Sequence, residues 1–419
     1  MNRDLVENKG PLSPYRVLDL SDENGQLAGR ILADLGADTI IVEPIDGSPS
    51  RRLGPYYHDI PDPQKSLFWF SLNTNKRSIT LDIGKTPGKD ILKQLIKSAD
   101  FLIESYPPGY LDELELGFDV LKEINPRLVM TSITPFGQYG PWRDYKSSDL
   151  VQMALSGLVY LSGEPDREPL RIPVPQACLH AGSWAAAASM MALYGRQNLG
   201  HGQHIDVSIL ESVTWASYCA AEWWSYARLN MKREGTWRQQ GLSRMQLLFK
   251  CKDGYVLLFL LGGTMATIGE WKLVEWMEQE NKCPEWLRGF DWSKLDVSFV
   301  KQDFFDNLSE AISRFLLDKT KKSLFDWAMK NELFLAPVND ISDLFNNQQL
   351  SSRNFWVNLP HPELNESITY PGPFAVLSES PITIKGRAPL IGEHNTEIFE
   401  RELQMSREEL AGLREAKII

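Results

Sequence analysis

Several features that would narrow the function quickly are missing from this sequence of 419 residues. No window of about 18 apolar residues occurs, so the sequence predicts no membrane-spanning helix. The region after Met1 lacks the apolar core of a signal peptide, so we expect a cytoplasmic protein with reduced thiols. Cysteines are few, and none forms a CxxC pair or lies at metal-ligand spacing from a histidine, which argues against a metal site: Cys178, Cys219, Cys251 and Cys283.

Basic residues are in deficit, and the formal net charge is −11 at pH 7. Nucleic acids and anionic membranes attract proteins through basic patches, so neither is expected as a partner. An anionic small ligand stays compatible, because it needs only a local positive pocket. The one basic cluster we singled out, Asn75-Lys76-Arg77, is interpreted either as a solvated turn before a strand or as a phosphate contact.

Glycine-rich phosphate loops are absent as well. There is no Walker A sequence, and no GxGxxG follows a strand pattern, which excludes the usual NAD fingerprint. The segment Gly200-His201-Gly202-Gln203 is interpreted as a helix C-cap and turn. Gly262-Gly263 allows two interpretations, a simple turn or a close approach of backbone to a ligand.

A nucleophilic triad also lacks support. His180, His201 and His204 are near Cys178 in sequence, but no strand–turn–helix elbow surrounds a serine or cysteine. For His180 a helix-capping or ligand-edge role is favoured over catalysis. Cys178 is interpreted as a small buried side chain, with a reactive thiol at a helix N-terminus as the alternative.

What the chain does contain is a regular alternation of short apolar strands and helices in its first 135 residues. Strands are expected at 15–20, 39–43, 78–83, 101–103 and 128–133, and helices at 26–35 and 87–97. Strands rich in Ile, Leu and Val that alternate with helices pair in parallel and are covered on both faces. The pattern therefore predicts an α/β fold with a Rossmann-like large domain.

Later segments follow other patterns. Two long helices are expected at 179–196 and 209–229, and the tryptophans of the second (Trp215, Trp223 and Trp224) are interpreted as packing anchors, with ligand stacking as the alternative. From about residue 240, short strands followed by helices rich in Trp and Phe predict a smaller α+β domain. We expect residues 1–235 to begin the large domain, 236–335 to form the small one, and 336–419 to return to the large domain as an extended segment.

Several long motifs resemble those of a known protein family, in the same order along the chain. The segments RVLDLSDENGQLAGRILADLGADTIIVEP, LNTNKRSITLDIGKTPGKDIL and LIESYPPGYLDELELGFDVLKEINPRLVMTSITPFGQYGPW resemble the N-terminal half of family III CoA-transferases. APVNDISDLFNNQQLSSRNFW, TYPGPF and RAPLIGEHN resemble its C-terminal part, so the resemblance covers nearly the whole chain. It implies an interlocked dimer, in which two chains thread through each other and the large domain is assembled from both chain ends.

The resemblance also implies a covalent mechanism. A catalytic Asp attacks an acyl-CoA thioester, a mixed anhydride forms, and the returning CoA thiolate gives an enzyme–CoA thioester. In this chain the stretch VPQACLHAG places Cys178, or within two residues Gln176, at the position of that Asp. A Gln amide is not a nucleophile, and a Cys thiol would only exchange one thioester for another. We therefore expect no catalytic residue here. Ser148 stands where racemases of the superfamily carry a histidine, which argues against a racemase.

The resemblance implies that CoA is a substrate and that no other cofactor and no metal are needed. It implies contacts with CoA at five positions: Leu81, Asp82, Ser105, Tyr106 and Lys146. Two positions depart from the family pattern, because Pro44 and Glu113 stand where it usually has arginines near the phosphates. A negative charge near a phosphate is unfavourable, so CoA is expected to bind weakly.

The resemblance thus implies a subunit of a family III CoA-transferase that moves CoA between an acyl-CoA and a carboxylic acid. Its sharpest form is a benzylsuccinate-type enzyme that uses succinyl-CoA and an aromatic succinate. The expected partner is a homologous, catalytically complete chain, in a heterodimer or heterotetramer. Two alternatives stay open: a self-sufficient homodimeric acyl-CoA transferase, and a non-enzymatic CoA-binding or scaffold protein.

Overall fold

The computed structural model describes residues 10–217 and 219–419, which form two compact units. Unit 1 contains the residues up to Val159, Arg171–Ser225 and Leu350–Ile419. Unit 2 contains Tyr160–Leu170 and Tyr226–Gln349. The domain boundaries expected after residues 235 and 335 stay predictions, and the sequence pattern had not singled out the segment Tyr160–Leu170.

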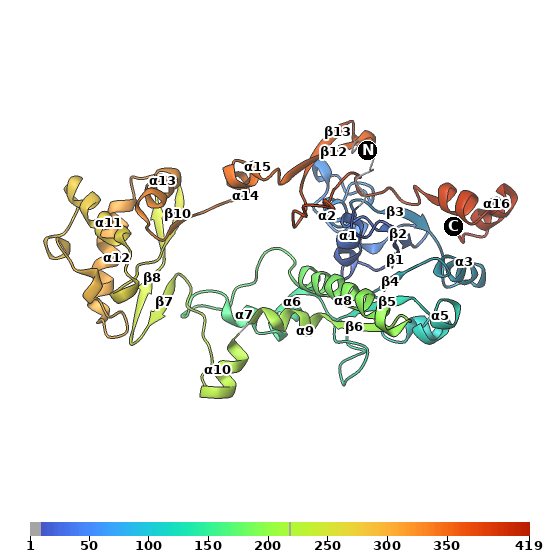
Figure 1. Cartoon of the computed structure of the whole chain (residues 1–419), viewed down its shortest axis with the longest axis horizontal. Helices are drawn as coiled ribbons and strands as arrows, with labels where there is room; N and C mark the ends of the chain where they lie inside the picture. The colour runs from blue at the N-terminus through green and yellow to red at the C-terminus, as the bar shows by residue number, and fades with distance from the viewer. Residues whose placement is uncertain (1–9, 218) are drawn as a thin grey trace. The chain divides into compact units, whose positions relative to one another are not determined.

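Unit 1 is built on a six-stranded parallel sheet of order β3-β2-β1-β4-β5-β6 (Figure 1). Its strands are β1 (Arg16–Leu20), β2 (Asp38–Glu43), β3 (Arg77–Thr80), β4 (Phe101–Glu104), β5 (Val129–Thr134) and β6 (His204–Ser208). The strand order reverses between β1 and β4, and open α/β sheets bind ligands at such a switch point, beyond the carboxyl ends of the strands. The predicted Rossmann-like α/β fold is confirmed.

Helices cover both faces of this sheet, as parallel pairing requires. On one face, Val17 of β1 packs in a core with α1 (Gln26–Asp34) and α8 (Ala177–Leu199). On the other, Leu18 packs in a core shared by α3 (Thr86–Ile96), α5 (Phe118–Ile124) and the C-terminal α16 (Arg407–Glu415). Helix α8 can approach α1 closely because Gly182 has no side chain. A Cβ at that position would come within 2.7 Å of the Leu27 Cβ. The expected helix at 179–196 is confirmed.

The second expected long helix, at 209–229, is wrong. The chain instead forms α9 (Ile209–Thr214), a 3-10 turn over Trp215–Ser217, and α10 (Ala220–Ala227), while Tyr218 lies outside the described residues. Trp215, Trp223 and Trp224 are largely exposed, so they do not anchor the core of their own chain. Helical periodicity predicted a buried face, but no residue of α10 is buried.

Shorter elements complete unit 1. They are α2 (Leu67–Leu72), α4 (Tyr110–Glu113), α6 (Asp149–Leu155), the hairpin β12 (Trp356–His361) and β13 (Glu366–Pro371), and two helices that cross its border, α7 (Leu158–Leu161) and α15 (Gln348–Ser352). The hairpin is held against α2 by a small core in which Leu359 and Tyr370 join Trp69 and Phe70. The C-terminal segment thus packs on elements from the N-terminal part of the chain.

Unit 2 has an antiparallel sheet of order β11-β10-β9 and a separate β7–β8 hairpin. Its elements are β7 (Trp237–Gln240), β8 (Ser243–Gln246), β9 (Leu248–Cys251), β10 (Gly254–Leu258), α11 (Ile268–Gln279), α12 (Gln302–Leu316), α13 (Lys321–Asn331), β11 (Leu335–Val338) and α14 (Ile341–Phe345). A Cβ at Gly262 would lie 2.4 Å from the Leu295 carbonyl oxygen, so close packing within the unit itself explains this glycine. Within the described part of the chain, no helix has the length and apolarity that crossing a membrane would take.

Candidate active site at the sheet edge

A cavity of about 360 Å³ lies at the carboxyl edge of the unit 1 sheet, close to the switch point. We call it the edge pocket. Loops that follow β1 and β5 line it together with the N-terminal residues of α6, α8 and α9. Its lining residues are Glu23, Asn24, Leu53, Gly54, Phe68, Pro135, Ser147, Ser148, Asp149, Gln152, Pro175, Ala177, Cys178 and Ile209.

Cys178 is the second residue of α8 and only 6% exposed. Burial, and next the charge of Asp149, raise the pKa of its thiol to about 11. The thiolate is the nucleophilic form of cysteine, so at neutral pH this side chain is a neutral thiol and a poor nucleophile. The burial of Cys178 agrees with its interpretation as a small buried side chain. Whether the thiol reacts stays a prediction.

Gln176 is the N-cap residue of α8, and its side-chain amide forms hydrogen bonds with the backbone. Its amide nitrogen Nε2 donates to the carbonyl oxygens of Val174 and Pro175, at 3.3 and 3.2 Å. The backbone N–H groups of Gln176 and Ala177 both donate to Asp149 Oδ1, at 2.7 and 2.8 Å. Asp149 therefore satisfies the open N-terminus of α8 and balances its positive end.

Two further polar residues of the edge pocket were not predicted from the sequence. Glu23 follows β1, and burial, with Asp22 as the next cause, raises its pKa. Gln152 on α6 is 1% exposed. The position of Glu23 just after a strand at the switch point is the signal that sequence reasoning overlooked. Ser148, weighed above as a racemase position, caps α6, since its Oγ accepts from the Val151 N–H at 3.4 Å.

The CoA contacts expected after β3 lie in packed or internally bonded positions. Leu81 is buried in the core of unit 1. The Asp82 N–H donates to the Ile418 carbonyl oxygen at 2.8 Å, and its Oδ1 accepts from the Gly84 N–H at 3.0 Å. Asp82 also pairs with Lys85 at 3.4 Å. β3 is separated from β4 by two strands, so the fold does not bring these two residues into contact with the others.

The expected contacts after β4 and β5 are more accessible but also engaged. Ser105 Oγ donates to Asp22 Oδ1 at 2.7 Å and accepts from the Asp22 N–H at 2.8 Å, which ties the loops on the two sides of the switch point together. The ring of Tyr106 lies 4.9 Å from that of Tyr110, and burial raises the Tyr106 pKa. Lys146 is exposed on the loop before α6. The role of these residues stays a prediction.

Basic side chains on the half of the sheet formed by β3, β2 and β1 are held in ion pairs. Lys76 Nζ is buried and donates to Asp19 Oδ2 at 2.8 Å, and Arg77 pairs with Asp38 at 2.6 Å. The interpretation of this cluster as a solvated turn is therefore wrong for Lys76. Arg51 is buried as well, with Nε and Nη2 2.6 and 2.7 Å from the two carboxylate oxygens of Glu43. These cations neutralise the chain's own carboxylates.

The histidines do not complete a triad with Cys178. His180 lies within α8, where its N–H donates to the Gln176 carbonyl oxygen at 3.0 Å. His201 Nδ1 lies 2.8 Å from the Gly202 carbonyl oxygen. His204 lies on β6, with its Nε2 2.8 Å from Ser132 Oγ. The Gly200 φ of +78° fits the helix C-cap that the sequence predicts.

Comparison with known proteins identifies the family of this chain. A model of the family described as CoA-transferase family III matches residues 12–395. The chain belongs to CoA-transferase family III. It is 35% identical to the succinyl-CoA:(R)-benzylsuccinate CoA-transferase subunit BbsE of Thauera aromatica, over 92% of this chain and 93% of that protein. The predicted family is confirmed.

Other relatives in CoA-transferase family III are more distant. The succinyl-CoA–L-malate CoA-transferase beta subunit of Chloroflexus aurantiacus is 28% identical, over 98% of each chain. The formyl-CoA:oxalate CoA-transferase of Streptomyces avermitilis is 29% identical, over 97% of this chain and 99% of its own. A crystal structure of a CAIB/BAIF family protein from Brucella suis superposes with a TM-score of 0.81 at 25% identity, over 93% of this chain and 99% of that one.

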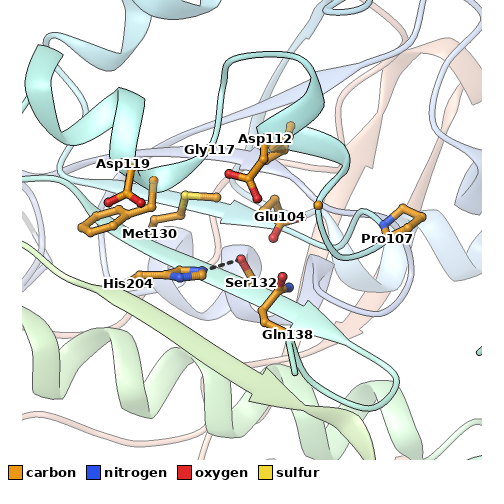
Figure 2. A pocket seen from close by; sticks show the side chains of 12 residues that line it. Glu104, Pro107, Asp112, Gly117, Asp119, Met130, Ser132, Gln138 and His204 are labelled. Atoms are coloured by element: carbon orange, nitrogen blue, oxygen red, sulfur yellow. Dashed lines mark hydrogen bonds between the residues drawn. The ribbon is translucent and has the colours of Figure 1, made fainter. Parts of the chain in front are cut away.

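This family III chain has a second pocket, of about 280 Å³, over the half of the sheet formed by β4, β5 and β6 (Figure 2). We call it the Glu104 pocket. Glu104, Asp112 and Asp119 contribute acidic groups to its lining. Glu104 is 4% exposed, and burial raises its pKa to about 7. The neighbouring His204 has a pKa lowered by burial, so none of the described residues that line the pocket is cationic at neutral pH.

Proposed function

We propose that this chain is a non-catalytic subunit of a CoA-transferase that moves CoA between an acyl-CoA and a carboxylic acid. A homologous chain supplies the nucleophile. The observation that carries the proposal is Cys178 itself, a buried thiol at the start of α8 in the lining of the edge pocket, where the resemblance expects a catalytic Asp. A thiol in place of a carboxylate cannot form the mixed anhydride on which the family's exchange depends.

The names of two relatives support a heteromeric enzyme. The Thauera aromatica protein is called a subunit of a succinyl-CoA:(R)-benzylsuccinate CoA-transferase, and the Chloroflexus aurantiacus protein a beta subunit. We therefore propose succinyl-CoA as donor and an aromatic succinate as acceptor. A cytoplasmic location and the lack of any further cofactor stay predictions.

Weak binding of CoA by this chain is part of the proposal. CoA carries phosphates, which favour cationic side chains and charge-assisted hydrogen bonds. Lys76 and Arg51 are committed to buried carboxylates, and Pro44 and Glu113 offer no cation. The acidic lining of the Glu104 pocket also disfavours the binding of phosphates there.

An interlocked dimer is supported by apolar surface that this chain leaves uncovered. On α8 and the turn after α9, the exposed fractions of Trp184, Met191, Tyr194 and Trp215 are 43%, 69%, 71% and 71%. Apolar surface of this extent on one part of a molecule is typical of an interaction site. A threaded partner should bury more than about 2,000 Å² in total, as obligate interfaces do. A well-folded monomer in light scattering at micromolar concentration would contradict this arrangement.

The deciding experiment compares this chain alone with the chain co-expressed with a homologous family III chain that carries the Asp. CoA transfer from succinyl-CoA to an aromatic succinate is expected only from the pair. Mass spectrometry of the trapped enzyme–CoA thioester should locate it on the partner chain. Transfer by this chain alone, with CoA on one of its own carboxylates, would overturn the proposal.

One observation favours a second candidate, a self-sufficient homodimeric acyl-CoA transferase. Besides Asp149, which caps α8, the edge pocket contains the carboxyl group of Glu23. If Glu23 were the nucleophile, the chain alone would transfer CoA, Glu23→Gln would abolish transfer, and the trapped thioester would map to Glu23. Asn24→Ala, a neighbouring change in the same lining, serves as the matched control.

A further inference from the structure

Unit 2 has an apolar groove of about 540 Å³ on the face of its sheet that turns away from the core. We call it the unit 2 groove. Successive residues of a strand point to opposite faces of a sheet. In β10, Val256 and Leu258 are buried in the core of unit 2, whereas Leu257 between them is exposed and lines the groove. The lining residues are Arg238, Leu247, Leu257, Phe259, Phe325, Met329, Leu333, Phe334, Leu335 and Ala336.

Helix α13 and the residue before β11 supply large apolar side chains to the unit 2 groove. Leu324 of α13 is buried in the core, but Phe325 and Met329, one helical turn apart, line the groove and are exposed. Phe334 is 54% exposed, and its carbonyl oxygen accepts from the Phe259 N–H at 2.9 Å, so these two residues are neighbours across the sheet. Large apolar side chains that gather in a concave surface are typical of a binding site.

Arg238 on β7 is the one charged side chain among the described residues that line the unit 2 groove. Its guanidinium carbon lies 4.8 Å from the centroid of the Phe259 ring, and this cation–π contact holds it beside the apolar wall. Within residues 10–217 and 219–419, no carboxylate pairs with Arg238, and its side-chain N–H groups have no acceptor. Arg233 differs, because its guanidinium donates to three backbone carbonyl oxygens of its own chain. The Arg238 guanidinium is therefore open to an external anion.

From these contacts we propose that the unit 2 groove binds a monocarboxylate with an aromatic or alkyl portion. The carboxylate pairs with Arg238, whose planar fork matches its two oxygens, and the apolar portion packs against Phe325 and Met329. A single cation in the lining matches a single carboxylate, because a second one would be unpaired against an apolar wall. The volume of the groove lies in the range of roughly 300–1,000 Å³ that is usual for small-molecule sites. The inference goes beyond the proposed function and does not depend on it.

The test separates the charge of the ligand from its apolar portion with three probes: 4-phenylbutyrate, 4-phenylbutan-1-ol and butyrate. Each is titrated into the full chain, together with any partner that co-purifies, and binding is followed by calorimetry and by soaking crystals. The first probe is expected to bind with its carboxylate on Arg238. The alcohol lacks the charge-assisted hydrogen bonds and butyrate lacks the ring, so each should bind more weakly by roughly ten-fold or more.

Variants of two exposed arginines sharpen the result. Arg238→Gln should weaken 4-phenylbutyrate by roughly ten-fold or more and leave the alcohol nearly unchanged. Arg244→Gln is the matched control, because Arg244 lies 4.8 Å from the Trp237 ring in the same hairpin but does not line the groove. Arg238→Lys keeps the charge without the fork, so it should give an intermediate affinity, and it replaces Arg238→Gln if that variant fails to fold.

A second variant tests the apolar wall. Met329 is 61% exposed, so Met329→Gln should fold, and it should weaken 4-phenylbutyrate and the alcohol by a similar factor. Three outcomes would overturn the inference: the alcohol binding as tightly as 4-phenylbutyrate, equal effects of Arg238→Gln and Arg244→Gln, or no probe in the groove because a partner chain covers it. The last outcome would make this surface a protein interface. CoA transfer, which decides the proposed function, enters none of these measurements.

Discussion

The two halves of the unit 1 sheet handle buried acids in opposite ways. On the half formed by β3, β2 and β1, Asp19 is paired with Lys76 at 2.8 Å and Glu43 with Arg51 at 2.6 Å, all of them buried. On the half formed by β4, β5 and β6, Glu104 is equally buried but is bonded by the Tyr106 N–H at 2.7 Å and by the Ser132 side chain, with no cation.

The buried acids of the first half stabilise the fold as ion pairs, whereas Glu104 on the second half lines a pocket. A buried carboxylate with a cation in good geometry is compensated, and its removal from water is offset by Coulomb attraction and hydrogen bonds. A buried carboxyl without a cation takes up a proton more readily instead, which is why the Glu104 pKa rises to about 7. The Glu104 pocket lies on the half where the buried acid has no cation, whereas the edge pocket lies at the switch point between the halves. The basic residues Lys76 and Arg51 are held in ion pairs on the other half.

The largest expected effect comes from removing a cation on the compensated half. Lys76→Met leaves the buried Asp19 carboxylate without its partner, and breaking a buried pair in this way costs about 3–5 kcal/mol. The free energy of unfolding from urea titration measures it. Lys122→Met is the matched control, because its pair with Asp119 is exposed and should contribute far less to stability. Equal losses in the two variants would contradict the comparison.

An intermediate effect is expected on the uncompensated half, and it depends on pH. The folded-state pKa of Glu104 is raised from 4.5 to about 7, so the contribution of this group to stability is fully present below about pH 4.5 and is lost as pH rises through about 7. Glu104→Gln keeps an acceptor for the Tyr106 N–H and removes the charge. It should stabilise the protein at pH 8 relative to wild type by on the order of 2 kcal/mol, and by little or nothing at pH 5.

Unfolding of Glu104→Gln and wild type at both pH values tests this expectation. Glu113→Gln, which removes an exposed acid from the same loop region, is the control and should show no such difference between the two pH values. A loss of stability in Glu104→Gln at pH 8 would mean that a cation or an ordered contact compensates Glu104 after all.

The sequence predicts the elements whose signals are local. The strands β1 to β5 and the helices α1, α3 and α8 could be predicted, because buried apolar runs and helical periodicity are local signals. Their helices also end where the sequence indicates: Gly36, with φ of +99°, follows α1 as expected. The break between α9 and α10 could not be predicted, since apolar residues there face outward and give the same periodicity as a buried face.

For the site, the sequence identified Cys178 and Gln176 but not the partners that set their chemistry. That Asp149 caps α8 depends on two segments 27 residues apart meeting at the sheet edge. The ion pair between Asp19 and Lys76 spans 57 residues, and Gly29 makes room for it, because a Cβ there would come within 2.1 Å of Asp19 Oδ2. Such long-range pairings leave no periodic trace in one sequence, so the cluster around Lys76 was misread as surface.

The smallest expected effect concerns Cys178 itself. If the thiol takes no part in chemistry, Cys178→Ala in the complex with a catalytic partner should change kcat/KM for CoA transfer by less than about two-fold, whereas loss of a true covalent nucleophile removes most of the activity. Alkylation offers an independent readout. The raised pKa and burial of Cys178 predict that iodoacetamide modifies the partly exposed Cys219 first at pH 8. A large drop in transfer on Cys178→Ala, with the melting temperature unchanged, would show instead that the thiol contacts the reacting groups.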